Sequence, residues 1–129
     1  MLPLTGLYAA ILTLMMIGLA AHVIILRGKS GISLMQGDSL ALAERMRRHG
    51  NFIETVPVAL ILMGISELQG LSSFWLHAMG GALVAGRAIH PFGIHHDQPA
   101  NPARIIGFVL TMVAMLVAVA WILWRSFAA

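Results

Sequence analysis

Side chains able to do chemistry are concentrated in residues 44–57, where charged and amide groups lead without a break into an apolar segment. Arg47, Asn51 and Glu54 stand at i, i+4 and i+7, so a helix places all three on one face. The apolar part, Phe52–Ile65, has fourteen residues, whereas a helix needs about 20 to cross a bilayer. A crossing helix must therefore reach back to Arg47 and carry Glu54 below the headgroups, where ionisable groups are costly and commonly functional.

Cationic and imidazole groups elsewhere in the chain could share that site. Arg87 and His90 are three residues apart, so they lie on one helix face. Arg104 lies just inside an expected helix start, where backbone N–H groups favour an anion. A guanidinium there would lower the pKa of a nearby bound thiol. We expect a cationic pocket with one embedded carboxylate and an amide. The alternatives are that Glu54 only pairs with a bundle arginine and that Arg104 is a cation at the membrane edge.

Metal and cysteine chemistry have weaker support. His90, His95, His96 and Asp97 offer imidazole and carboxylate groups of the kind that suit zinc or iron. Their spacing matches no strong metal-binding template, so we predict no metal site and interpret the segment as a solvated turn. The chain has no cysteine, which excludes a disulfide framework and a cysteine nucleophile. Any thiol chemistry would need a thiol from outside.

The elements that must position these residues are membrane helices. Of the 129 residues, 59% are hydrophobic and 10% charged, a balance far more apolar than that of a soluble domain. We predict a single domain over residues 1–129, an all-α integral membrane protein built as a four-transmembrane-helix bundle. The first apolar segment is too long for a signal-peptide core, so we expect it to be a retained span. The net charge of +3 could suggest nucleic acid, but basic residues that flank apolar segments fit membrane orientation better, and no nucleic-acid partner is expected.

Breakers and capping residues divide the chain. Asp38 or Ser39 can cap the second helix, and Asn101 followed by Pro102 is a strong start signal for the fourth. Small residues at intervals of four in the third span predict close packing against a neighbouring helix; they are Ala78, Ala82 and Gly86. The predicted spans are approximately 5–26, 40–67, 72–90 and 102–124.

Basic residues also predict the orientation. Five lysines and arginines flank the first connection, Arg87 and Arg104 flank the second long one, and the turn between the second and third helices has none. By the positive-inside rule both basic connections are cytoplasmic and both termini are outside. Arg125 is the exception.

The pattern resembles the MAPEG family, the membrane-associated proteins in eicosanoid and glutathione metabolism. Its most specific part is Arg47-x-x-x-Asn51-x-x-Glu54-x-x-Pro57, supported by Arg87-x-x-His90 and Pro102-x-Arg104. Family members are four-helix membrane proteins that form trimers and mostly use glutathione. The resemblance implies that Arg104 activates the glutathione sulfur and that five residues bind glutathione: Arg47, Asn51, Glu54, Arg87 and His90.

The implied function is that of a membrane glutathione transferase or peroxidase. The arginine-stabilised thiolate would attack a hydrophobic electrophile or a lipid hydroperoxide arriving from the bilayer. The chain resembles bacterial-type members, which implies a homotrimer among membrane lipids of the bacterial inner membrane, with the active site facing the cytoplasm. Gly50, Ile94 and Ile105 depart from donor positions of glutathione-using members, which favours a non-catalytic lipid- or protein-binding member as the alternative. A small transporter in which Glu54 cycles a proton is a third hypothesis.

Overall fold

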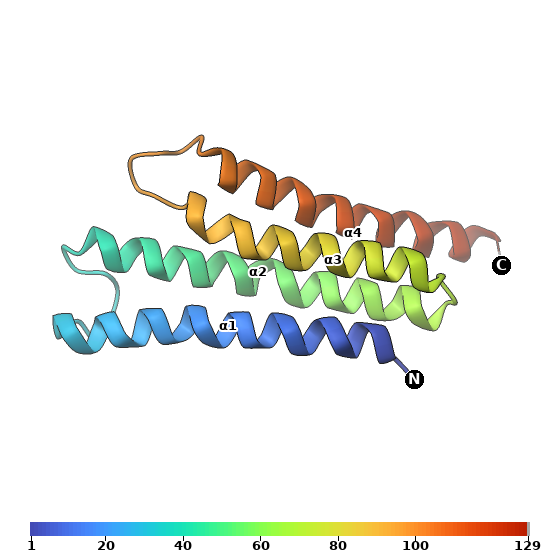
Figure 1. Cartoon of the computed structure of the whole chain (residues 1–129), viewed down its shortest axis with the longest axis horizontal. Coiled ribbons are helices and arrows are strands. Elements are labelled where there is room, and N and C mark those ends of the chain that lie inside the picture. The colour runs from blue at the N-terminus through green and yellow to red at the C-terminus, as the bar shows by residue number, and fades with distance from the viewer. Residues whose placement is uncertain (129) are drawn as a thin grey trace.

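Four helices account for most of the chain in the computed structural model, which describes residues 1–128. They are α1 (Pro3–Ser30), α2 (Leu40–Leu68), α3 (Ser73–Ile89) and α4 (Pro102–Ala128), with a short 3₁₀ helix, η1 (His90–Gly93), after α3. The helices lie side by side, and both termini are at the same end of the bundle (Figure 1). No strand occurs among the described residues, so the predicted all-α class is confirmed.

Three of the four helices have the length and composition of membrane spans. α1, α2 and α4 have 28, 29 and 27 residues and are apolar enough to cross. α3 has 17 residues, fewer than the about 20 that a span needs. It was expected to include residue 90, but it ends at Ile89, and His90 begins η1 instead. Pro91 cannot continue the α-helical hydrogen bonding, which explains the change to a tighter turn.

The outer surface of the bundle is apolar. Large aliphatic and aromatic side chains on all four helices are largely exposed, among them Leu14, Ile61, Phe74 and Leu116. A water-soluble bundle would place polar residues at such positions. This surface suits contact with acyl chains.

The predicted helix starts are confirmed. Ser39 Oγ accepts a hydrogen bond from the Leu42 amide at 3.2 Å, so Ser39 rather than Asp38 caps α2. Asn101 Oδ1 accepts from the Ala103 amide at 3.0 Å, and α4 begins at Pro102. Polar capping side chains therefore fix where two helices enter the bundle.

α3 and α4 approach each other closely at a pair of glycines. A Cβ added to Gly86 would lie 2.8 Å from the carbonyl oxygen of Gly107, and a Cβ added to Gly107 would lie 2.6 Å from that of Gly86. Ala78 and Ala82 line a hollow shared with Ala114 of α4. The predicted close packing is thus confirmed at Gly86, where α4 is the neighbour, while Ala78 and Ala82 border a gap between the two helices. This contact sets how near Arg87 comes to α4.

The bundle has one strongly basic end. Seven of the eight lysines and arginines lie between Arg27 and Arg104, at the end away from the termini (Figure 1). Arg125 lies at the opposite end, in the last turn of α4. Glu67 also lies at that opposite end, where its carboxylate accepts hydrogen bonds from the amides of Leu4 at 3.0 Å and Thr5 at 2.8 Å. Anionic ligands would therefore be attracted to the end that holds the predicted site.

Candidate functional site

Among the basic residues at this end of the bundle, Arg87 has a buried side chain. It is 1% exposed and donates from Nη1 to Asn51 Oδ1 at 3.1 Å and to Thr55 Oγ1 at 3.2 Å. Its Nη2 donates to the carbonyl of Gly107 at 3.1 Å. All three acceptors are neutral, so Arg87 has no ion-pair partner among them. One guanidinium thereby joins α2, α3 and α4.

Asn51 is positioned from two sides. Its side-chain oxygen accepts from Arg87, and its backbone carbonyl accepts a hydrogen bond from Thr55 Oγ1 at 2.9 Å. Thr55 also accepts from Arg87, so the three residues form a closed set of contacts. Satisfied polar groups of this kind hold side chains in one orientation. Asn51 thus contacts α3 through Arg87, and the contribution of Thr55 was not foreseen.

Arg47 and Glu54 lie apart from this buried set. Arg47 Nη1 and Glu54 Oε1 are 3.4 Å apart, and the two side chains are 58% and 55% exposed. Glu54 therefore has Arg47 rather than Arg87 as its partner. The face was expected to look inward, but within one chain only its Asn51 turns to the core. The predicted set of binding residues divides into a buried part and an open part.

Arg104 shares a pocket with Arg47. The pocket has a volume of about 390 Å³ and lies between the first turns of α2 and the loop before α4. Its lining residues are Ala43, Glu44, Arg47, Ile94, His95, His96, Pro99 and Arg104. Gly93 in η1 touches the Arg104 backbone so closely that no Cβ would fit between them. Because of this contact, the end of η1 fixes where Arg104 enters the pocket.

His90 lies at the α3–α4 contact instead of in the pocket. It is 3% exposed, and a Cβ on Gly107 would come within 2.7 Å of the His90 Cβ. The predicted site residues are therefore brought to one end of the bundle in three groups: Asn51 with Arg87, His90 beside Gly107, and Arg47 with Glu54 and Arg104.

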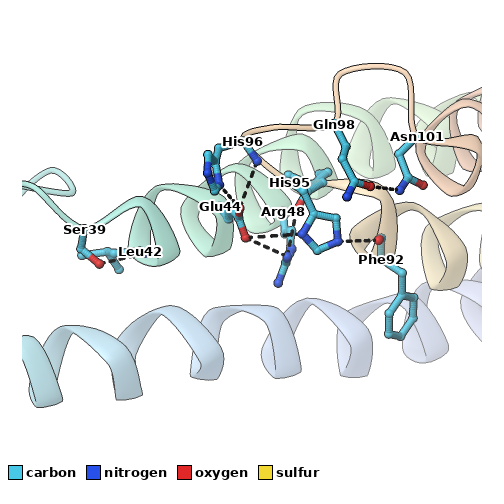
Figure 2. Close-up of polar contacts among 10 residues, drawn as sticks. Ser39, Leu42, Glu44, Arg48, Phe92, His95, His96, Gln98 and Asn101 are labelled. Atoms are coloured by element: carbon cyan, nitrogen blue, oxygen red, sulfur yellow. Dashed lines mark hydrogen bonds and ion pairs between the residues drawn. The ribbon is translucent and has the colours of Figure 1, made fainter.

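Glu44 organises a cluster at the edge of the pocket (Figure 2). Its Oε1 accepts from the backbone amide of His96 at 3.0 Å and lies 2.8 Å from His96 Nδ1. Its Oε2 accepts from Arg48 Nη2 at 3.2 Å and lies 3.8 Å from His95 Nδ1. Arg48 Nη2 also donates to the Ile94 carbonyl at 2.8 Å. Because the Glu44 carboxylate accepts a hydrogen bond from the imidazole, the pKa of His96 is raised above its ordinary value.

Comparison with known proteins supports the family resemblance that the pattern of residues suggested. The family model described as "MAPEG family" matches residues 5–124, which is nearly the whole chain. The chain belongs to the MAPEG family. Its relatives include the protein named inner membrane protein YecN in Escherichia coli strain K12, 32% identical over 120 residues that cover 93% of this chain and 90% of the relative. YecN of Escherichia coli O6:H1 matches with the same figures. No solved structure matches this MAPEG chain significantly.

Family membership and the apolar helices make this MAPEG chain an integral membrane protein. Two of the three histidines considered for a metal site, His95 and His96, contact Glu44. Within residues 1–128, no group of three or more histidines, cysteines, aspartates or glutamates is placed to hold a metal ion.

Sequence reasoning missed Glu44 as part of this MAPEG site. Its spacing of four from Arg48 signals a local ion pair on one helix face. Nothing in the sequence points to the loop partner, which is 52 residues away.

Proposed function

We propose that this MAPEG protein is a membrane glutathione transferase or peroxidase that acts on hydrophobic electrophiles or lipid hydroperoxides. The observation that carries the proposal is the pocket in which Arg47 and Arg104 lie together; Asn51, which contacts Arg87, follows Arg47 by one turn of α2. Family membership adds support, because the chain retains the motif residues on α2, on α3 and at the start of α4.

The charges of the site complement those of glutathione, which has two carboxylates and one ammonium group. Arg47 is suited to bind a carboxylate with two parallel hydrogen bonds. Glu54 is suited to the ammonium group, and its weak, exposed pairing with Arg47 costs little to open. Asn51 would bind through its amide, oriented by the buried Arg87. His90 is buried beside Gly107 and does not line the pocket, so it would support the binding residues from the α3–α4 contact.

Arg104 is the proposed catalytic residue. Its guanidinium, at the start of α4, would lower the pKa of the glutathione thiol and stabilise the thiolate. In conjugation, the sulfur forms a bond to the electrophilic carbon and the leaving group departs with its electron pair. In peroxide reduction, the sulfur attacks the terminal peroxide oxygen and releases the lipid alcohol, and a second glutathione then gives the disulfide and water. The chain supplies orientation and charge stabilisation.

The open Arg47–Glu54 face supports a site completed by a second copy of the chain. Both side chains are more than half exposed, and charged groups at this depth need a protein or water-filled environment. A homotrimer embedded in membrane lipids would provide it. By the distribution of basic residues, the site faces the cytoplasm and both termini face outward. The relatives' name favours the inner membrane of a bacterium.

A non-catalytic lipid- or protein-binding role is the second candidate. Ile94 is 6% exposed and lines the pocket that holds Arg104, while Ile105 directly follows Arg104. Neither side chain offers a hydroxyl group to a sulfur atom. A pocket with fewer donors would bind a thiol more weakly and activate it less.

The test is turnover by the purified full chain in lipid nanodiscs. Glutathione and an aromatic halide with a nitro-activated leaving group are supplied first, and glutathione with a fatty-acid hydroperoxide second. The proposal expects a rate above the uncatalysed one in at least one assay. Glutathione binding without turnover would support the second candidate. If glutathione does not bind, the proposal is wrong.

A further inference from the structure

We propose that Glu44 is a positioning residue that holds the loop of residues 94–101 against α2 and so fixes the mouth of the pocket shared by Arg47 and Arg104. The inference deepens the proposed function and rests on it for its consequence in glutathione binding. Its structural part, the attachment of the loop, stands on the contacts of Glu44 alone (Figure 2).

The loop is attached to α2 at two neighbouring points. Glu44 receives two contacts from His96, one from the backbone amide at 3.0 Å and one from the ring at 2.8 Å. One turn later, Arg48 donates to the Ile94 carbonyl at 2.8 Å and to Glu44 at 3.2 Å. Gln98 and Asn101 bond to each other at 2.8 Å, a contact inside the loop that does not tie it to α2. Loss of the Glu44 carboxylate would therefore leave Arg48 to hold the loop.

The same loop forms one wall of the pocket. Ile94, His95, His96 and Pro99 line it from the loop side, and Glu44 and Arg47 line it from α2. Arg104 follows the loop directly at the start of α4. Movement of the loop away from α2 would therefore widen the opening between the two arginines. A ligand that needs both arginines would bind less tightly.

The attachment depends on the charge of His96. A protonated imidazole bonded to a carboxylate makes a stronger contact than a neutral one, and the pKa of His96 is raised above its ordinary 6.5 by Glu44. The added strength is present at lower pH and is lost as the pH rises through this raised pKa. The charged and titratable groups around the contact are Arg48, His95 and Asp97, with Arg47 and Arg104 across the pocket. The backbone bond from His96 persists, so the loop loosens without being released.

Distance measurement tests the attachment directly. The chain has no cysteine, so Ala41→Cys on α2 and Ala100→Cys in the loop, both exposed, can carry a pair of spin labels in the full chain. We expect a narrow distance distribution at about pH 6 and a broader one at about pH 9. Glu44→Ala should broaden it at both pH values. Glu44→Gln, which keeps an acceptor for the His96 amide, should remove the pH dependence.

Matched variants decide the interpretation. His96→Gln should also remove the pH dependence, and it tests the same contact if a Glu44 variant fails to fold. Asp38→Asn removes a carboxylate at the same end of the bundle, outside this cluster, and should leave the distribution unchanged. The proposal would be overturned if Glu44→Ala gave the same distance distributions as the unaltered chain, narrow at the lower pH and broader at the higher pH. An equal broadening in Asp38→Asn would also overturn it.

Binding separates this inference from the proposed function. Calorimetry with glutathione should give a dissociation constant about two- to fivefold higher for Glu44→Ala than for the unaltered chain, with the difference shrinking at high pH. If the distance distributions of the loop change as expected in the Glu44 variants but neither the unaltered chain nor any variant binds glutathione, the proposed function is wrong and the loop attachment stands. If glutathione binds equally well to both chains and the loop does not respond, the role of Glu44 is wrong and the proposed function is unaffected.

Discussion

Arg87 on α3 and Asn51 on α2 are joined by a 3.1 Å hydrogen bond from Nη1 to Oδ1, although they are 36 residues apart in the chain. The Arg87 side chain is buried, whereas Asn51 is half-buried. α2, which carries the polar residues of the proposed site, is thus bound to α3 through the buried side chain of Arg87. Toward a ligand of the proposed site, Arg87 would therefore be a positioning residue that acts through Asn51.

Arg104→Ala is predicted to lower turnover on the order of 10- to 100-fold, with a smaller effect on glutathione affinity. The reason is that Arg104, in its proposed role, would stabilise a charge that is fully formed only on the thiolate. Steady-state kinetics and calorimetry on the same preparation measure the two effects. Arg125→Ala is the matched control, because Arg125 lies in the last turn of α4 at the other end of the bundle. Equal losses in the two variants would remove the assignment of Arg104.

Glu54→Gln is predicted to weaken glutathione binding about two- to tenfold, because the carboxylate that would pair with the ammonium group is neutralised. The exposed Arg47–Glu54 pair contributes little stability, so the unfolding midpoint should change little. Calorimetric titration provides the affinity, with Asp38→Asn as a control for loss of one negative charge. An unchanged affinity would leave Glu54 as a partner of Arg47 alone.

Arg87→Met is predicted to destabilise the bundle by about 1–3 kcal/mol, since Asn51, Thr55 and the Gly107 carbonyl each lose a donor. Unfolding in mixed micelles of increasing denaturing detergent measures the loss. Arg125→Met, at an exposed position, is the control for the substitution itself. A destabilisation no greater than that of the control would mean that the three contacts contribute nothing net.

Gly107→Ala is predicted to destabilise the α3–α4 contact by about 1–3 kcal/mol, because the new Cβ would meet the Gly86 carbonyl oxygen at 2.6 Å and overpack the interface. Gly81→Ala is the control, since a Cβ on Gly81 would have no heavy atom within 4 Å. Thermal unfolding of both variants compares them. If both behave alike, the close backbone approach is not a stability determinant.

Much of the fold could be predicted because its signals are local. The start of α2 after Ser39 and that of α4 at Pro102 follow from capping chemistry that involves adjacent residues. The approach of Gly86 to α4 follows from the period of small residues, although the pattern does not name the partner helix. The end of α3 was misplaced by one residue because Pro91 acts on the turn before it.

The site could be predicted only in part. The spacing of Arg47, Asn51 and Glu54 gives a shared helix face, but it does not show that Asn51 turns to Arg87 while Glu54 stays open. Thr55 and the Gly107 carbonyl carry no sequence signal for binding a guanidinium. Glu44 was noted only as part of the charged stretch 44–57. Its contact with the loop could not be predicted, because it depends on how the last two helices are connected. Contacts between distant segments require the tertiary structure.

The carboxylate of Glu67, near the end of α2, completes the first turn of α1 by accepting from the amides of Leu4 and Thr5. In a growing chain those two amides are translated more than sixty residues before their acceptor. α1 is therefore made before its first two amides have this acceptor, and the Glu67 carboxylate reaches them only when α2 has returned to the same end of the bundle. The amides of Leu4 and Thr5 therefore reach this acceptor only once α1 and α2 are paired as a hairpin.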